Sequence, residues 1–296
     1  MRYCKNTKTQ IDVRFDSVND MMAAANFADS HTNPLATAKQ RSVNKDRFKK
    51  RLGDEDSDWM IGITDAKSLE NLFAKPPQWL LDAGTECLDT INAAVGSRLD
   101  APIKRRRRIG VEDGDSVNID RFLVRSPEPW ERMESHRDTT PIVTITVDLA
   151  TSARQSREEL LWRGAAAVAT AMQIERLGGQ CEILGINTIN KLDVDMKVNM
   201  TQVITIKPAH EKATLSSTLI CTGHLGFFRY AVINTFFACS KQKVNSVCGY
   251  PGNTSSALLQ ELGSDVHISR DCTTSGKAIA KANEMMESSQ KGQAHV

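Results

Sequence analysis

The chain has 296 residues, of which 40% are hydrophobic and 25% are charged, values that are ordinary for a globular protein with a packed core. Its 38 basic residues nearly balance 36 acidic ones, so the net charge of +2 excludes an affinity for nucleic acid or anionic membrane spread over the whole surface. Seven scattered cysteines without a CxxC pair argue against a disulfide framework or a structural zinc site, and the absence of a long apolar run argues against a membrane span. Together these features predict a cytoplasmic protein.

The first 140 residues divide into two expected parts. Residues 1–58 are polar and mixed in charge, which predicts a solvated, flexible arm with a short helix near residues 17–28. Residues 59–140 predict a mostly helical extension and a connector. Its clearest element follows Pro76 and Pro77, where apolar residues recur at helical spacing up to Val95.

A run of five cations lies within this extension. It consists of Lys104, Arg105, Arg106, Arg107 and Arg108. Such a run can neutralise several phosphates and give a salt-dependent affinity for nucleic acid. Acidic residues at 112, 113 and 115 nearly cancel it, so a solvated strand or linker is the favoured interpretation.

Residues 141–290 predict an α/β domain. The run 141–147 (PIVTITV) reads as a strand that ends at Asp148, a helix follows over residues 156–177, and Gly178 and Gly179 end that helix. Residues 181–186 (CEILGI) then read as a second strand. A strand–helix–strand unit of this length is typical of a parallel crossover.

The rest of the domain continues this alternation. Further strands are expected at residues 202–206, 244–248 and 265–269, and further helices at 225–238, 254–262 and 274–288. Strands that alternate with helices predict an open, mainly parallel, doubly wound sheet.

Residues 144–184, with Asp148-Leu149-Ala150-Thr151-Ser152 after the first strand, resemble the opening of a von Willebrand factor A domain. In that family a first strand ends in D-x-S-x-S before a crossing helix. The lead-in through the arginine run and residues 114–121 is similar to the CobT-type subunit of cobaltochelatase and its divergent phage-encoded relatives. The resemblance implies a von Willebrand A or Rossmann-like α/β fold.

The resemblance also implies a metal-ion-dependent adhesion site, in which oxygen ligands at the carboxyl end of the sheet hold Mg²⁺ for a partner's carboxylate. Asp148 and Ser152 match two ligand positions, Ala150 replaces a ligand serine, and Thr222 is the candidate for the distant threonine. The family's second aspartate is missing from residues 244–249, so the site is degenerate. The alternative role for Asp148 is to cap the following helix or to order its loop.

The resulting hypothesis is a non-enzymatic protein-interaction module with a degenerate adhesion site, acting with an AAA+ ATPase. The alternative is a nucleic-acid-binding accessory protein that uses residues 104–108 and the basic part of the N-terminal arm. No P-loop motif is present, and a lone CxxH pair, Cys221 with His224, gives little support for a catalytic dyad.

Overall fold

The computed structural model describes most of the chain. The described residues are 2–6, 10–30, 63, 66–95, 107–111, 116–134, 142–151, 155–176, 178–190, 199–232, 235 and 250–293. The expected strand at residues 244–248 and the cations at residues 104–106 lie outside them.

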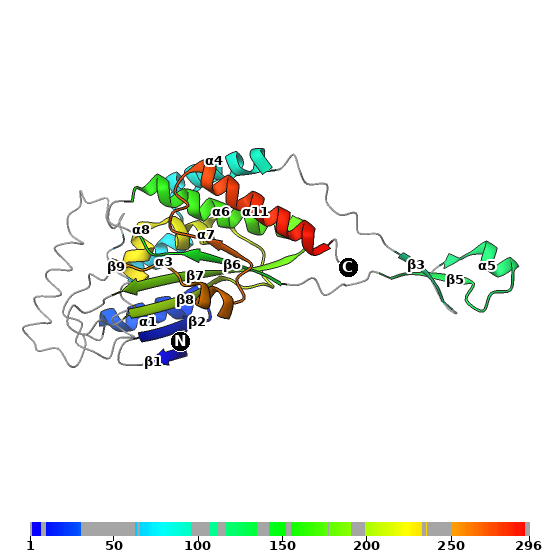
Figure 1. The fold of residues 1–296 in the computed structure, drawn as a ribbon, viewed down its shortest axis with the longest axis horizontal. Helices are drawn as coiled ribbons and strands as arrows, with labels where there is room; N and C mark the ends of the chain where they lie inside the picture. Colours follow the sequence, from blue (N-terminus) through cyan, green and yellow to red (C-terminus); the bar gives the residue numbers. More distant parts are fainter. Residues whose placement is uncertain are drawn as a thin grey trace, which may run out of the picture.

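One seven-stranded sheet forms the centre of the fold (Figure 1). Its strands run in the order β1-β2-β8-β7-β6-β10, and β9 pairs with β7. Their bounds are β1 (Arg2–Asn6), β2 (Gln10–Phe15), β6 (Ile142–Asp148), β7 (Gln180–Asn190), β8 (Asn199–Lys207), β9 (Tyr250–Pro251) and β10 (Val266–Ile268). Strand β6 is parallel to both of its neighbours, β7 and β10. Strand β8 returns antiparallel to β7 and parallel to β2.

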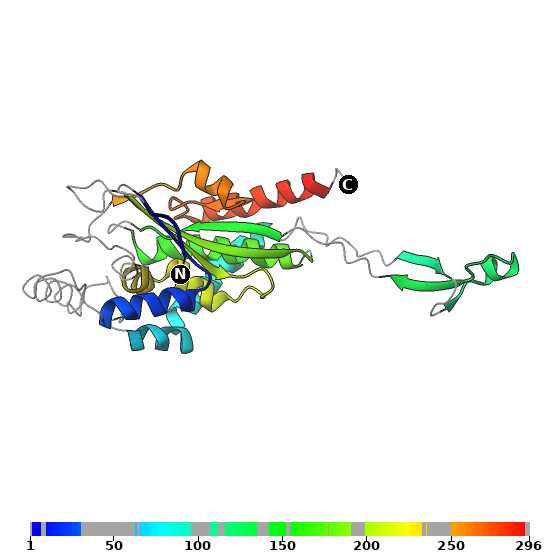
Figure 2. The same cartoon turned by 90° about the horizontal axis from the view of Figure 1, so that it is seen from below.

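The helices lie on both sides of this sheet. They are α1 (Val18–Ser30), α3 (Ala66–Ala74), α4 (Gln78–Val95), α6 (Arg157–Arg176), α7 (Leu215–Gly223), α8 (Leu225–Phe227), the π-helix η2 (Phe228–Val232), α10 (Ser256–Glu261) and α11 (Ser275–Gln293). Helix α6 connects β6 to β7, and α4, α7 and α11 pack against it. Figure 2 shows α10 (orange) on the opposite side of the sheet from α1 and α3. The expected α/β class is confirmed.

Successive side chains of β6 point to opposite faces of the sheet. Ile145 and Val147 are fully buried in the hydrophobic core under the helices. Thr144, Thr146 and Asp148 alternate with them and point to the opposite face, and they too are at most 7% exposed. The polar residues of this strand are therefore gathered on one face, and buried polar groups require hydrogen-bond partners.

The predicted elements of the α/β domain are present at 142–148, 157–176, 180–190, 199–207 and 266–268. Gly178 has a φ of 82°, the left-handed conformation that ends a helix, and the Gly178-Gly179 stop is confirmed. Helix α4 also follows Pro76 and Pro77 as expected, with Leu80, Ile91 and Val95 fully buried.

The N-terminal residues differ from the expected polar arm. Strand β2 pairs in parallel with β8, and its Ile11, Val13 and Phe15 are at most 4% exposed. Met21 and Ala25 of α1 are fully buried as well. The segment 10–25 therefore contributes side chains to the main core. Although β2 is short and charged, its apolar residues occupy alternate positions and so form one buried face.

A second, three-stranded sheet lies within residues 107–134 and is drawn at the right of Figure 1. Strand β5 (Trp130–Glu134) pairs antiparallel with β3 (Arg107–Val111) on one side and with β4 (Ser116–Val117) on the other. A short helix, α5 (Ile119–Leu123), follows β4. This segment was expected to be a connector, and it has a sheet of its own.

Candidate functional site

Asp148 occupies the end of the central parallel strand. It pairs in register with Ile186 of β7, and the Leu149 N–H donates to the Ile186 carbonyl at 2.6 Å just beyond it. The residue is 4% exposed. Since ligand sites of open α/β sheets lie at the carboxyl ends of the strands, Asp148 is in the position expected of a functional carboxylate.

Three groups from two distant segments converge on the Asp148 carboxylate. The Thr254 hydroxyl, in the turn before α10, donates to Oδ1. The Arg270 backbone N–H, in the turn after β10, donates to Oδ2 at 3.1 Å. His267 of β10 places Nε2 at 3.5 Å from the same Oδ2. Both carboxylate oxygens are therefore engaged by donors of the protein itself.

These donors determine the charge of Asp148. Burial alone would raise its pKa, but hydrogen bonds from His267 and Thr254, the charge of a protonated His267 and the Arg270 N–H together hold the pKa below its usual value of 3.8. The carboxylate is consequently ionised at neutral pH, and its loss of water is offset by directed hydrogen bonds.

A buried cation lies below the loop that follows Asp148. Arg163 of α6 is 1% exposed, and its guanidinium donates to the Ala150 and Thr222 carbonyls, each at 3.2 Å. Burial lowers its pKa to about 10, although the nearby negative charge of Asp148 opposes that shift. Arg163 thus ties the loop to the end of α7 and places positive charge near the carboxylate.

The His267 ring is held from its other side. Its Nδ1 lies 3.0 Å from the hydroxyl of Thr146, its register partner on β6. The same hydroxyl lies 2.7 Å from the Ser264 hydroxyl. With Nδ1 engaged in this way, Nε2 is directed toward Asp148, and the side chain of His267 remains 22% exposed. The His267 ring is therefore partly in contact with solvent.

The structure gives a different outcome for each of the residues that the sequence grouped as metal ligands. Asp148 is at the expected place, and Ser152 lies outside the described residues. Thr222 is not among the groups that hydrogen-bond to the Asp148 carboxylate. Its hydroxyl donates to the Thr218 carbonyl at 2.7 Å inside α7, and its side chain packs where α7 meets Gly164 of α6.

The threonine whose hydroxyl donates to the Asp148 carboxylate is Thr254, and sequence reasoning missed it. A usable signal existed in the run Gly252-Asn253-Thr254-Ser255, since a glycine turn followed by hydroxyl residues typically opens a helix. Ser255 is indeed the N-cap of α10, accepting from the Leu258 N–H at 3.2 Å. The preceding hydroxyl is then free to face the sheet.

The donor set suits Mg²⁺ only in part. Oxygens of Asp148 and Thr254 are ligands of the kind that Mg²⁺ prefers. The second carboxylate oxygen instead faces two hydrogen-bond donors, His267 and the Arg270 N–H. Among the described residues, no group of three or more His, Cys, Asp or Glu side chains could hold a metal ion.

The basic run is described only at its end. Arg107 and Arg108 lie in β3, where the register places Arg107 opposite Glu134 and Arg108 opposite Met133. The register therefore describes only the backbone pairing of β3 with β5, and the cations at residues 104–106 lie outside the described residues.

Cys221 and His224 are both buried at the end of α7. Burial raises the pKa of the Cys221 thiol and, with the charge of Arg157, lowers the pKa of His224 to about 4. His224 accepts the Phe227 N–H at Nδ1, at 3.3 Å. A protonated thiol and a neutral imidazole that caps a helix do not form an activated nucleophile.

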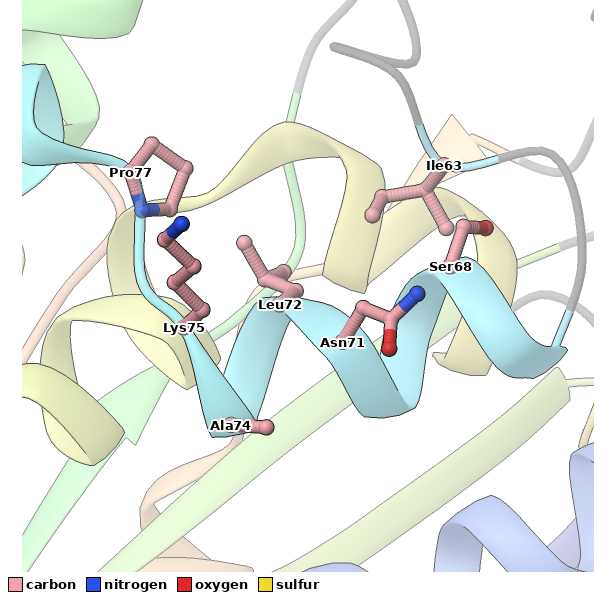
Figure 3. Close-up of a pocket in the computed structure, with 7 residues that line it drawn as sticks. All are labelled: Ile63, Ser68, Asn71, Leu72, Ala74, Lys75 and Pro77. Carbon is pink, nitrogen blue, oxygen red and sulfur yellow. The ribbon is translucent and has the colours of Figure 1, made fainter.

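A hollow of about 400 Å³ opens beside α3 (Figure 3). Its lining comprises Ile63, Ser68, Asn71, Leu72, Ala74, Lys75 and Pro77. None of these residues contacts Asp148 or its partners, so the hollow is not part of the Asp148 cluster. Within the described part of the chain, no helix is long and apolar enough to cross a membrane.

Comparison with known families gives one match, to a model described as a domain of unknown function, DUF7192, over residues 4–287. The chain belongs to this family. The match spans the N-terminal strands, the three-stranded sheet and the α/β domain together. No curated protein and no solved structure matches the chain.

Proposed function

We propose that this DUF7192 protein is a non-enzymatic, cytoplasmic protein-interaction module of the von Willebrand factor A type, which captures its partner at the carboxyl end of β6. The observation that carries the proposal is the convergence of Thr254, His267 and Arg270 on Asp148. Buried polar groups drawn from distant segments to one carboxylate at this edge of the sheet are typical of a functional site.

The order of elements supports the same interpretation. Strand β6 ends at Asp148, α6 crosses over, and β7 follows a glycine turn, as the resemblance implies. The second aspartate of the family is missing from residues 244–249. Asp271 directly follows Arg270 in the chain and is exposed, so we propose it as a carboxylate that a partner or an ion can reach.

The proposed site works with little or no help from a metal ion. His267, the Arg270 N–H and the buried charge of Arg163 already balance Asp148, which is the task that Mg²⁺ performs in an intact adhesion site. If Mg²⁺ binds, then Asp148, Thr254, Ser152 and Asp271 are the residues that would hold it. The partner proposed from the resemblance is an AAA+ ATPase, and its contact would centre on the exposed edge of His267 and the loops around it.

Thermal melting with Mg²⁺, Mn²⁺ or EDTA tests the metal dependence. We expect midpoints that change little among the three conditions, both for the wild type and for Thr254→Val, which removes the hydroxyl at nearly constant shape. Thr222→Ala is the matched control and should respond as the wild type does. A rise with Mg²⁺ that Thr254→Val abolishes and Thr222→Ala retains would contradict metal-free operation, because a ligand that binds only the folded state raises its midpoint.

Nucleic-acid binding through residues 104–108 is the second proposal, and most of that basic run lies outside the described residues.

A further inference from the structure

Large apolar side chains gather on the surface of the three-stranded sheet and its helix. Among the described residues, all but one of the large apolar side chains classed as exposed lie in residues 117–130, the exception being Ile142. We call these six the α5 patch: Val117, Ile119, Phe122, Leu123, Val124 and Trp130. Their exposed fractions run from 37% at Trp130 to 77% at Val124. Large exposed apolar side chains that gather in one short segment indicate an interaction site.

Local hydrogen bonds, and not burial, hold α5 in place. At its start the Asn118 side chain accepts from the Arg121 N–H at 3.2 Å. At its end the Ser126 N–H donates to the Arg121 carbonyl and the Arg125 N–H to the Phe122 carbonyl, at 2.9 and 3.1 Å. This is the pattern of a Schellman motif. No residue of α5 is buried in the part of the chain that the structure describes. The apolar side chains are thus fixed in an exposed arrangement.

The backbone at the end of α5 carries strain. Arg125 has a φ of 54°, in the left-handed region where glycine is the usual residue. A side chain in this conformation costs about 1 kcal/mol or more and persists where the surroundings require it.

The unit made of residues 107–134 is too small to be stable through a core of its own. Units below about 40 residues usually need disulfides, a metal or association with another chain. The segment contains neither cysteine nor histidine, so a disulfide or a Cys/His zinc site within it is excluded. Association through the α5 patch is then a route to stability for this unit.

We propose that the α5 patch docks against the same patch of a second copy of this chain. Within residues 117–130, whose side chains the structure describes, the charged residues are Asp120, Arg121, Arg125 and Glu128, two acids and two bases that are all exposed. A two-fold pairing can set each acid against a base, since such an interface is self-complementary. Nucleic acid or an anionic membrane would instead require a basic rim.

The size of the patch also fits a second copy. Six side chains of these types, at the exposures given, present on the order of 600 Å² of apolar surface. With its polar rim, each copy approaches the roughly 800 Å² that a stable interface buries per partner. This inference is independent of the function proposed for Asp148, whose cluster shares no residue with the patch.

Sedimentation velocity of the full chain over a wide range of concentrations tests the proposal. We expect the wild type to shift from monomer to dimer as concentration rises. Phe122→Ser with Leu123→Ser should weaken this association roughly a hundredfold, because two large apolar contacts are lost. Val124→Arg, at the most exposed position, should weaken it as well, by placing two like charges at the contact. Ile142→Ser, which changes an exposed apolar residue outside the patch, is the matched control and should dimerise as the wild type does.

Melting midpoints establish that the variants are folded, and Val124→Arg provides a second route if the double variant is not. A wild type that stays monomeric at every concentration would overturn the proposal, even if the patch captures a different protein. Dimerisation that survives the patch substitutions, or that Ile142→Ser weakens equally, would also overturn it.

Discussion

The close contact between α6 and α7 at Gly164 predicts that a larger residue at this position destabilises the protein. A Cβ added at Gly164 would lie 2.5 Å from the Thr222 hydroxyl and 3.1 Å from a Leu219 methyl group. Both neighbours are buried, so neither can move into solvent. Gly164→Ala therefore forces the two helices apart. Gly276→Ala is the matched control, because the described residues leave open space within 4 Å at that position of α11.

The magnitudes decide the outcome. Replacing a helical glycine by alanine favours folding by up to about 1 kcal/mol at either position. At Gly164 the overpacking costs about 1–3 kcal/mol, which outweighs this gain, so the substitution destabilises the folded state. We expect Gly164→Ala to lower the free energy of unfolding by about 1–2 kcal/mol, or the midpoint by roughly 2–8 °C. Gly276→Ala should leave stability unchanged or raise it slightly.

Urea denaturation of both variants measures this difference, and adding Thr222→Ala to Gly164→Ala should restore part of the loss because it removes the clashing hydroxyl. If Gly164→Ala were as stable as Gly276→Ala, the helices would not meet at Thr222. The conclusion that Thr222 serves packing and not the Asp148 site would then be refuted.

Three further predictions concern other parts of the chain. Because the pKa of His224 falls to about 4 in the folded state, its contribution to stability is complete above the unfolded value of about 6.5 and is lost as pH falls toward 4. His224→Asn keeps an acceptor for the Phe227 N–H, so it should remove up to about 3 kcal/mol of that acid sensitivity in unfolding curves, and an unchanged pH profile would speak against the burial of His224. Arg125→Gly should slow hydrogen exchange at the Arg125 and Ser126 amides by relieving the left-handed strain, whereas Arg125→Ala should not. Binding of duplex DNA or RNA should be weak even at low salt, and a tight affinity that falls steeply with salt and is lost when residues 104–108 are neutralised would favour the alternative function.

Local pattern was sufficient to predict the main elements of the α/β domain. The β6, α6 and β7 segments carry long apolar runs or helical periodicity bounded by glycine turns, and such signals survive in a single sequence. Strand β2 was missed because its three inward residues sit among charges, so composition suggested an exposed arm. Its place beside β8 depends on a partner almost 190 residues away, which local pattern cannot reveal.

Of the candidate site, the sequence predicted Asp148 but not the residues that contact its carboxylate. Asp148 was found because the motif after the first strand is local in sequence. Thr254, His267 and Arg270 lie more than 100 residues further along the chain. The pairing of β10 with β6 brings His267 and Arg270 to Asp148, and the segment before α10 brings Thr254. Thr222 was chosen from a glycine turn without knowledge that its hydroxyl is satisfied within α7.

The most direct test of the central claim is partner capture by the Asp148 cluster. Tagged wild-type chain, Asp148→Ala, Thr254→Val and the control Thr222→Ala would be purified from their native cells, and the co-purifying proteins quantified by mass spectrometry. Melting midpoints would confirm that each variant is folded, since Asp148→Ala removes the acceptor of the Thr254 hydroxyl and of the Arg270 N–H, at a cost of about 1–3 kcal/mol each. The account predicts that an AAA+ ATPase is retained by the wild type and by Thr222→Ala, and is lost or strongly reduced with Asp148→Ala and Thr254→Val. Equal retention by all four folded proteins would contradict it.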